Sequence, residues 1–257
     1  MAKGATRRAR QGGARGEAAF LEGYDPRRFE RPSVAVDVAL VSAAEGALHT
    51  LVVRRAEHPA KGRWALPGGF VGLDEPLEAA AARVLATKSG LEGLFVEQLY
   101  TFGDPRRDPR TRVISVAYFA LVDFARLAKA TRGSSEVAVA RIAVPWEGET
   151  GGPIELESAP GAPLPLAFDH AEILGMAVKR LRGKLDYTPV GFQLLPPSFT
   201  LLELQRVHET VLGRPLNKDS FRRRMLASGL LEATGDRQAD VEHRPAERYR
   251  FARRSAV

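Results

Sequence analysis

Two adjacent glycines stand shortly before a helix-forming segment in the first half of the chain. Gly68 and Gly69 open a Gly-rich loop, and the segment 75–88 that follows has an Ala-rich body, with Pro76 at a position suited to a first helical turn. Backbone N–H groups in such a loop, together with the positive end of the helix dipole, attract phosphate. The sequence therefore predicts a phosphate-binding loop immediately before this helix.

Charged and aromatic side chains flank the loop. Arg54, Arg55 and the stretch KGRW at 61–64, which contains Arg63, precede it and are expected to form a charged wall. The loop TFGDPRRDPR at 101–110 follows and carries further arginines, which suit bidentate contacts with phosphate. Phe102 or the tryptophan of the KGRW stretch could stack on a base. Arg-rich Asp-Pro turns are also common as solvated loops, and this alternative stays open.

The segment WALPGGFVGLDEPLEAAAARVLATKSGL at 64–91 resembles the Nudix box, G-x5-E-x7-R-E-U-x-E-E-x-G-U with U aliphatic. The positions that match are Gly69, Glu75, Arg83, Leu85, Gly90 and Leu91. Val84, Thr87 and Lys88 stand where the family has glutamates, which include the ligands of its divalent ions. Mg²⁺ needs hard oxygen ligands, and a lysine at a ligand position repels it.

This resemblance implies a Nudix domain that binds a nucleoside diphosphate and does not cut it. It implies no catalytic residue, no bound metal and no cofactor. Glu75 and Arg83 resemble positions that tie the loop to the helix. The expected ligand-binding residues are Arg54, Arg63, Gly68, Gly69, Glu75, Arg83, Phe102, Arg106 and Arg107. A rival hypothesis is that Asp74, Glu78 or Glu97 rebuilds a metal site elsewhere.

Strands are expected on both sides of this helix. Two short β-branched runs, 34–41 and 48–54, predict a hairpin, and further strands are predicted over 94–102, 113–121 and 137–144. Strands before and after one helix make an α+β layered domain, and the Nudix resemblance specifies a Nudix-like α/β/α sandwich.

A Gly- and Pro-rich stretch and a second helix follow these strands. The stretch 150–165 is predicted to be a loop. Asp169, with Glu172 three residues later, predicts a capping box for a helix that runs to about Arg182. Cations at the end of this helix oppose its dipole, which is a structural role.

The last sixty residues contain two helix starts and a tight turn. Thr200 is a plausible N-cap for a helix over 201–212, and Gly213 breaks the pattern. Asn217 caps a second helix, in which Phe221 and Met225 point to the core. Paired strands are predicted at 230–233 and 248–251, around the polar loop 234–246. Helix, helix and hairpin is the order of a winged helix-turn-helix domain.

The second of these helices has the charge of a helix that enters the major groove. Three adjacent arginines by themselves more often form a solvated face, and the winged-helix context favours a DNA contact. The candidates for DNA contacts are Thr200, Asn217, Lys218, Ser220, Arg222, Arg223, Arg224, Arg244, Arg248 and Arg250.

Composition narrows the function classes. The 257 residues carry 38 Lys and Arg against 31 Asp and Glu, which favours a polyanionic partner. The excess lies at the two ends, with 8 basic and 4 acidic groups in residues 1–32 and 12 and 8 in residues 198–257. The absence of Cys excludes disulfides and thiolate metal sites. Without a long apolar run, we expect a cytoplasmic protein that does not contact a membrane.

A degenerate Nudix domain followed by a winged helix resembles the Nudix-related transcriptional regulators, the NrtR family. The resemblance covers about residues 30–257 and includes FDHA at 168–171, YTP at 187–189, LLP at 194–196 and DSFRR at 219–223. It implies a homodimeric repressor of NAD metabolism genes that binds a palindromic double-stranded operator and senses ADP-ribose or a related NAD metabolite.

The domains expected from this resemblance are a Nudix-like ligand-binding domain at 30–184 and a winged-helix DNA-binding domain at 185–257. Residues 1–29 are rich in Arg and Gly and contain few large apolar residues, which predicts a flexible basic arm that is either a passive tail or a source of phosphate contacts. Two alternatives stay open. One is an ADP-ribose or nucleotide pyrophosphatase with an accessory basic domain, and the other is an RNA-associated module.

Overall fold

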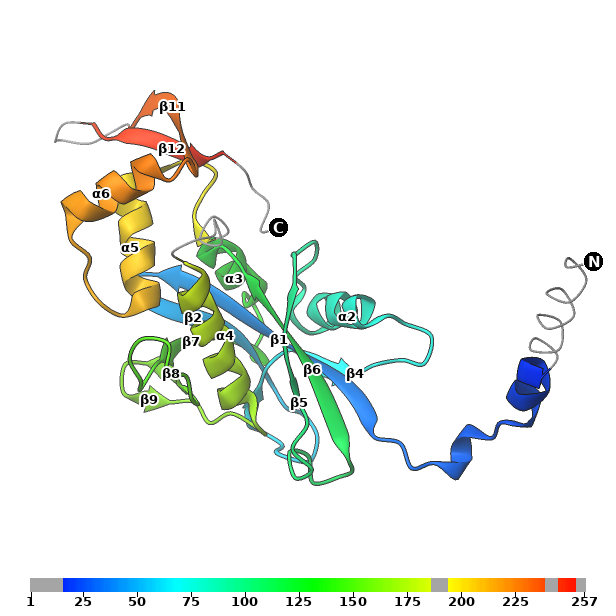
Figure 1. Cartoon of the computed structure of the whole chain (residues 1–257). Coiled ribbons are helices and arrows are strands. Elements are labelled where there is room, and N and C mark those ends of the chain that lie inside the picture. The colour runs from blue at the N-terminus through cyan, green and yellow to red at the C-terminus, as the bar shows by residue number, and fades with distance from the viewer. Residues whose placement is uncertain (1–15, 186–193, 239–244, 253–257) are drawn as a thin grey trace, which may run out of the picture. The chain divides into compact units, whose positions relative to one another are not determined.

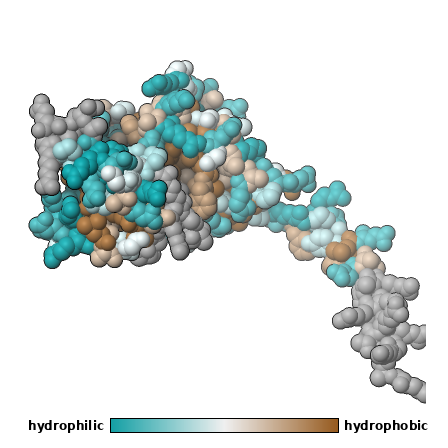
Figure 2. Space-filling view, turned by 90° about the horizontal axis from the view of Figure 1, so that it is seen from above, coloured by the Kyte–Doolittle hydropathy of each residue, from teal (hydrophilic) through white to brown (hydrophobic). Residues whose placement is uncertain are grey.

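A computed structural model describes residues 16–185, 194–238 and 245–252 (Figure 1). The chain divides into two units, Met1–Pro32 and Ser33–Val257. In the first unit, residues 16–23 form a helix, which the prediction of a flexible arm at 1–29 did not include, and the 3-10 turn Pro26–Arg28 follows. Phe20 is 65% exposed and Phe29 is 59% exposed, and Figure 2 shows apolar atoms among hydrophilic ones in this segment.

A mixed sheet forms the centre of the second unit. Its strands are β1 (Ser33–Ala44), β2 (Ala47–Arg54), β3 (Trp64–Ala65), β4 (Gly68–Phe70), β5 (Glu97–Phe102), β6 (Val113–Leu121), β7 (Val137–Ala143), β8 (Glu155–Ala159) and β9 (Ala162–Pro163). The order is β5-β6-β1-β2-β7-β8-β9, with β4 beside β1 and β3 beside β2. β1 and β6 run parallel, while β1 and β2 form the predicted hairpin.

Helices cover both faces of this sheet. Successive side chains of β1 point to opposite faces, and they are buried on both. Val36, Val38 and Leu40 pack with helices α2 (Leu77–Ser89) and α3 (Phe124–Ala130) in one core cluster. Ala39 and Val41 belong to the cluster that contains α4 (His170–Lys184). Figure 1 shows α2 and α4 on opposite sides of β1 and β6. The α/β/α sandwich is therefore confirmed.

Two local predictions are corrected, and one helix is added. The stretch 150–165 is not only a loop, because β8 and β9 form a hairpin in it that extends the sheet beyond β7. Helix α3, which the pattern did not reveal, begins after Asp123, whose carboxylate accepts from the backbone N–H groups of Ala125 and Arg126. Asp169 precedes α4 but makes no side-chain capping hydrogen bond, because Arg107 binds its carboxylate instead.

The C-terminal part is a winged helix. Strand β10 (Phe199–Thr200) precedes α5 (Leu201–Leu212) and α6 (Lys218–Ala227), and β11 (Leu231–Arg237) pairs with β12 (Glu247–Phe251). Thr200 caps α5 in a capping box with Glu203, and α5 ends at Gly213, whose φ of 69° is left-handed. The order β10-β12-β11 adds one strand to the predicted hairpin.

One apolar cluster runs through both parts of the second unit. It contains Leu181 and Leu185 at the end of α4 together with Val207 and Val211 of α5. The same cluster includes Phe221 and Met225, so the prediction that these two residues face the core is confirmed. Within the described residues, no helix is long and apolar enough to cross a membrane.

Candidate functional site

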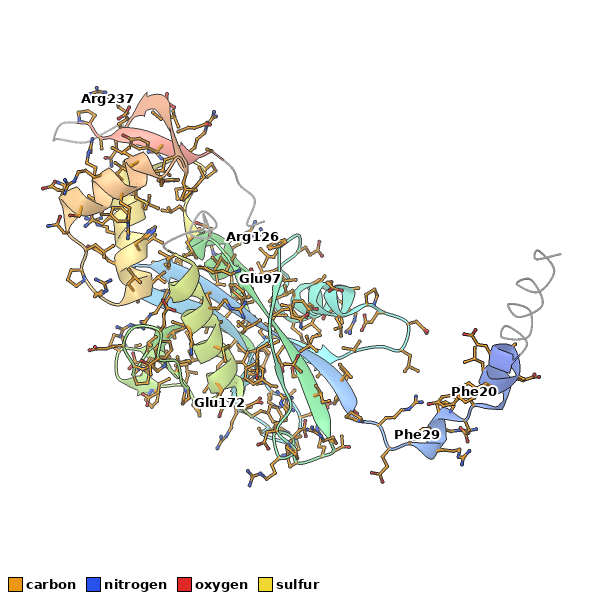
Figure 3. All side chains as sticks on the ribbon, in the orientation of Figure 1. Phe20, Phe29, Glu97, Arg126, Glu172 and Arg237 are labelled. Atoms are coloured by element: carbon orange, nitrogen blue, oxygen red, sulfur yellow. The ribbon has the colours of Figure 1, made fainter. Side chains whose placement is uncertain are left out.

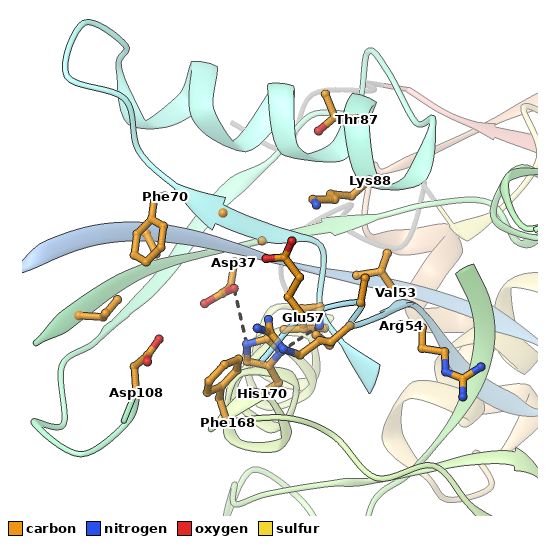
Figure 4. Close-up of a pocket in the computed structure, with 18 of the residues that line it drawn as sticks. Asp37, Val53, Arg54, Glu57, Phe70, Thr87, Lys88, Asp108, Phe168 and His170 are labelled. Carbon is orange, nitrogen blue, oxygen red and sulfur yellow. Dashed lines mark hydrogen bonds and ion pairs between the residues drawn. The ribbon is translucent and has the colours of Figure 1, made fainter. Parts of the chain in front are cut away.

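A cleft of about 500 Å³ lies beside β1, β2 and β4 (Figure 4). Gly68 and Gly69 line it, but they belong to β4 and pair with β1, so they do not form the predicted loop directly before a helix. A Cβ at Gly68 would lie 2.1 Å from Asp37 Oδ1, which explains the need for glycine. The only residues of α2 that line the cleft are Thr87 and Lys88, in its last turn. The expected phosphate contact with the helix N-terminus is therefore wrong for this cleft.

A buried charge network forms part of the cleft wall. Arg107 donates from Nε and Nη2 to the carboxylate of Asp169 at 2.8 and 2.7 Å, and from Nη2 to Asp37 Oδ2 at 3.3 Å. Ser115 donates to the same Asp37 oxygen at 2.5 Å. Burial alone would lower the pKa of Arg107, but the hydrogen bond to Asp169 and the two carboxylate charges outweigh it and raise the pKa. The network holds the loop 101–110 against the start of α4.

His170 joins this network to the segment between β3 and β4. Its Nδ1 accepts from the backbone N–H of Leu66 at 2.9 Å, and its Nε2 lies 3.6 Å from Asp37 Oδ1. Burial lowers the pKa of His170, although the charge of Asp37 opposes that shift. An acceptor at Nδ1 requires that this nitrogen carry no proton, so the imidazole is neutral and directs its N–H toward Asp37.

Glu75 and Arg83 stabilise the loop before α2 and do not line the cleft. Arg83 donates to both carboxylate oxygens of Glu75, at 2.9 and 2.5 Å, and to Phe70 O at 3.0 Å. The Gly72 N–H donates to Glu75 Oε1 at 2.7 Å. The hydrogen bond from Arg83, followed by that from Gly72, lowers the pKa of Glu75 to about 2. These contacts tie the loop to the helix, as the resemblance implied.

The three positions that depart from the Nudix box have different surroundings. Val84 is 1% exposed and belongs to the core. The Thr87 hydroxyl donates to Arg83 O at 2.8 Å. Lys88 extends from α2 into the cleft (Figure 4). In the part of the chain that the structure describes, no three His, Cys, Asp or Glu side chains come together to hold a metal ion. Glu97 binds Lys184 and Arg180 instead.

Four of the nine expected ligand-binding residues line the cleft, namely Arg54, Gly68, Gly69 and Arg107. The other five lie outside it, and Glu75 and Arg83 have been described above. Arg63 is exposed and reaches Leu166 O at 3.5 Å, and Arg106 is exposed beside Asp104. Phe102 packs against the core and contacts Tyr100 edge to face. Trp64 also packs against the core, so neither aromatic offers a free stacking face at the cleft.

Two other aromatic residues line the cleft. Phe70 is 46% exposed, and the guanidinium of Arg110 lies 5.3 Å from its ring centre. Phe168 lies beneath Arg55, whose guanidinium is 4.8 Å from its ring centre. Phe70 follows the glycines directly in the sequence. Phe168 comes from the distant start of α4, and no local pattern connects it with the cleft.

The second charged surface surrounds helix α6. Lys218, Ser220 and Arg222–Arg224 are exposed, and Asn217 Oδ1 accepts from the Ser220 N–H at 3.0 Å. Lys218, Arg222 and Arg237 line a cleft of about 560 Å³ between helices α5 and α6 and the wing, which is the hairpin of β11 and β12. Figure 3 shows Arg237 at the wing end of β11. Arg237 lies in the predicted polar loop but was not among the expected contacts.

The remaining expected DNA contacts have varied surroundings. Thr200 is 4% exposed, and its hydroxyl is used in the cap of α5. Arg248 donates from Nε to Ser198 Oγ at 2.7 Å, so it stabilises the start of the domain. Arg250 forms an exposed pair with Glu232 at 3.0 Å. Arg244 lies outside the described residues, as does the YTP motif.

A buried arginine joins the sandwich to the winged helix. Arg182 of α4 is 5% exposed and donates from Nε to Val211 O of α5 at 2.8 Å. Its Nη1 donates to Gly148 O at 2.8 Å and to Trp146 O at 3.3 Å. Burial lowers its pKa. Arg182 is a cation in the last turn of α4, as expected, and it also donates to carbonyls of two other segments.

Comparisons with known proteins agree with this architecture. The NUDIX domain matches residues 31–148, and the NrtR DNA-binding winged helix domain matches residues 191–251. The chain is 40% identical to the ADPR responsive transcriptional repressor NtrR of Acinetobacter baylyi over 238 residues, which is 92% of this chain and 88% of that protein.

Two solved structures are also similar to this chain. The Shewanella oneidensis NrtR complexed with a 27mer DNA has a TM-score of 0.69 and 34% identity, covering 85% of this chain and 93% of that one. A MutT/nudix family protein from Enterococcus faecalis has a TM-score of 0.75 and 28% identity, covering 93% of both chains. The fold and the two charged surfaces thus define a Nudix domain joined to a DNA-binding winged helix. The chain belongs to the NrtR family of transcriptional regulators.

Proposed function

We propose that this protein is a transcriptional repressor of NAD metabolism genes that binds operator DNA through α6 and the wing and responds to ADP-ribose or a related NAD metabolite in the cleft. The observation that carries the proposal is the joining of a nucleotide-sized cleft and an exposed basic helix in one chain. The Acinetobacter relative is named as ADPR responsive, and the Shewanella relative was solved with DNA.

Each of the two predicted domains has one of these binding functions. The Nudix-like domain at 30–184 binds the metabolite, and the winged helix at 185–257 binds DNA in the cytoplasm. Because two-fold symmetric proteins fit palindromic sites, a homodimer places two copies of α6 on half-sites about one helical turn apart.

A direct test is a gel-shift titration with an operator obtained by selection from random duplex DNA. We expect specific binding of duplex, and a change in operator affinity when ADP-ribose is added. An operator complex that is indifferent to ADP-ribose and other NAD metabolites would remove the sensing role and leave DNA binding intact. Stronger binding of single-stranded RNA than of duplex would instead support the RNA-associated alternative.

The cleft binds its ligand without hydrolysing it. Of the positions that carry glutamates in the Nudix box, Val84 is core, Thr87 is bonded to its own helix and Lys88 is cationic. Incubation with ADP-ribose and Mg²⁺ or Mn²⁺ should therefore release no AMP above the uncatalysed rate. Release of AMP at ordinary enzymatic speed would favour the pyrophosphatase alternative.

Helix α4 is the route by which the ligand acts on the DNA-binding part. His170 at its first turn lines the cleft, and Arg182 near its end binds Val211 O of α5. A helix from 170 to 184 is about 22 Å long and transmits a shift of one end to the other. Ligand alters operator affinity only as far as it favours one placement of the winged helices over another.

Replacement of Arg182 tests this route. Arg182→Met leaves Val211 O and Gly148 O without their donor, which loosens the junction. We expect ADP-ribose to bind with nearly unchanged affinity in calorimetry, while its effect on operator affinity in gel shifts falls toward none. Arg180→Met is the matched control, since Arg180 is on the same helix but contacts Glu97 and Leu99 O within the sandwich. A full ligand effect in Arg182→Met would exclude Arg182 as the link.

A further inference from the structure

The cleft combines five cationic with four acidic lining side chains. The cations are Arg54, Arg55, Lys88, Arg107 and Arg110, and the acids are Asp37, Glu57, Asp108 and Glu136. Such a wall attracts a diphosphate only if some of its cations are not already neutralised by protein groups. The contacts of each cation therefore decide which of them meets the ligand.

Three of the five cations are held by the protein. Arg107 binds Asp37 and Asp169, and Arg110 binds Asp108 at 2.7 Å. Arg55 donates to Pro59 O at 2.8 Å and lies over Phe168. Arg54 and Lys88 have no side-chain hydrogen bond or ion pair to any described residue. In Figure 4 the guanidinium of Arg54 is turned away from the cleft, whereas Lys88 extends into it.

The position of Lys88 on α2 gives its charge a particular importance. Helix α2 ends at Ser89, and its last turn, not its first, borders the cleft. A helix C-terminus carries partial negative charge, which repels an anion. A diphosphate placed beside this turn therefore needs a cation there to offset the helix end as well as its own charge.

A divalent ion, which the glutamates of an intact Nudix box would hold at this place, does not fit the residues present. Thr87 uses its hydroxyl in a bond to Arg83 O, Val84 is buried, and the described residues contain no cluster of metal ligands. An ammonium group at Lys88 adds a repulsive charge to any approaching cation. The same ammonium can donate three hydrogen bonds to phosphate oxygens.

We propose that the Lys88 ammonium takes the place of the divalent ion and is the positive group that binds the diphosphate of the ligand. Recognition of the diphosphate is then independent of divalent metal. This inference rests on the proposed function, because it names how the same cleft recognises ADP-ribose. It also applies to inorganic pyrophosphate, which has the diphosphate but neither nucleoside nor sugar.

The test is titration calorimetry of the full chain with ADP-ribose, in excess EDTA and again with Mg²⁺. For the unmodified protein we expect the same affinity in both buffers. Because a hydrogen bond from a charged group contributes more to binding than one from a neutral group, Lys88→Gln should weaken ADP-ribose binding about tenfold or more. Lys88→Arg keeps the charge and should retain most of the affinity.

Controls separate loss of charge from loss of fold. Lys129→Gln removes the same charge from an exposed position on α3 that does not line the cleft, and it should bind ADP-ribose as the unmodified chain does. Adenosine has no phosphate, so Lys88→Gln should bind it no more weakly than the unmodified protein does. Thermal unfolding of each variant checks that Lys88→Gln is folded.

The outcomes are distinguishable. Unchanged ADP-ribose affinity in Lys88→Gln, or a tenfold gain from Mg²⁺ in the unmodified protein, would overturn the role of Lys88. If ADP-ribose fails to bind but pyrophosphate binds through Lys88, the proposed effector is wrong and the present inference stands. If neither binds to the unmodified protein, both are wrong.

Discussion

Arg107→Met should lower the free energy of unfolding by about 3–5 kcal/mol, the usual loss when one partner of a buried ion pair is removed. The Arg107 side chain is 6% exposed, and its removal leaves the carboxylates of Asp37 and Asp169 without their cation. For a unit of this size we expect a fall in Tm of roughly 6–20 °C. Thermal unfolding followed by circular dichroism measures it.

The neighbouring residue provides a matched control. The Arg106 side chain is 92% exposed and lies 3.7 Å from Asp104. Because exposed pairs of this kind contribute little, Arg106→Met should change the free energy of unfolding by less than about 0.5 kcal/mol. Equal stability of the two variants would show that the Arg107 network does not hold the loop to α4.

Replacement of the arginines of α6 should have the largest effect on DNA binding. Arg222 and Arg223 are exposed on the helix that a winged helix places in the major groove. A contact with a base edge is worth roughly 1–3 kcal/mol, so Arg222→Ala or Arg223→Ala should weaken operator binding about 5- to 150-fold and relax specificity at one position. Gel shifts with the selected operator and its single-base variants measure both effects.

A contact with phosphate alone would give a different result. Binding would then weaken for operator and random duplex alike, and the slope of log affinity against log salt would fall by about one. Lys129→Ala is the control for general loss of charge, because it lies on α3 outside the winged helix. Unchanged operator binding in both arginine variants would move the DNA contact to another surface.

Elements with strong local patterns could be predicted from the sequence. Strand β6 has the predicted bounds, because a continuous run of β-branched and aromatic residues between polar turns identifies it. The winged helix was recognisable from the caps at Thr200 and Asn217 and from the buried pair Phe221 and Met225. These signals lie within a few residues of one another, where local rules apply.

Features that depend on distant contacts could not be predicted in this way. Asp169 has the spacing of a capping residue, but Arg107, 62 positions earlier, binds its carboxylate. Arg182 resembles a cation at a helix end, and only the packing of α5 against α4 shows that it is buried. Phe168 lines the cleft because the residues just before it form backbone hydrogen bonds with Trp64 of β3. No local sequence pattern indicates this contact.

The Nudix-like domain and the winged helix share an apolar cluster that contains both Leu181 of α4 and Val211 of α5. Neither domain is therefore expected to be stable when it is produced alone. A fragment that ends between α4 and α5 would expose the apolar residues of this cluster to water and would tend to aggregate. An exchange of DNA-binding domains between related regulators would accordingly require that the apolar surfaces of the two joined domains match. In this protein the winged helix and the Nudix-like domain therefore share one hydrophobic core.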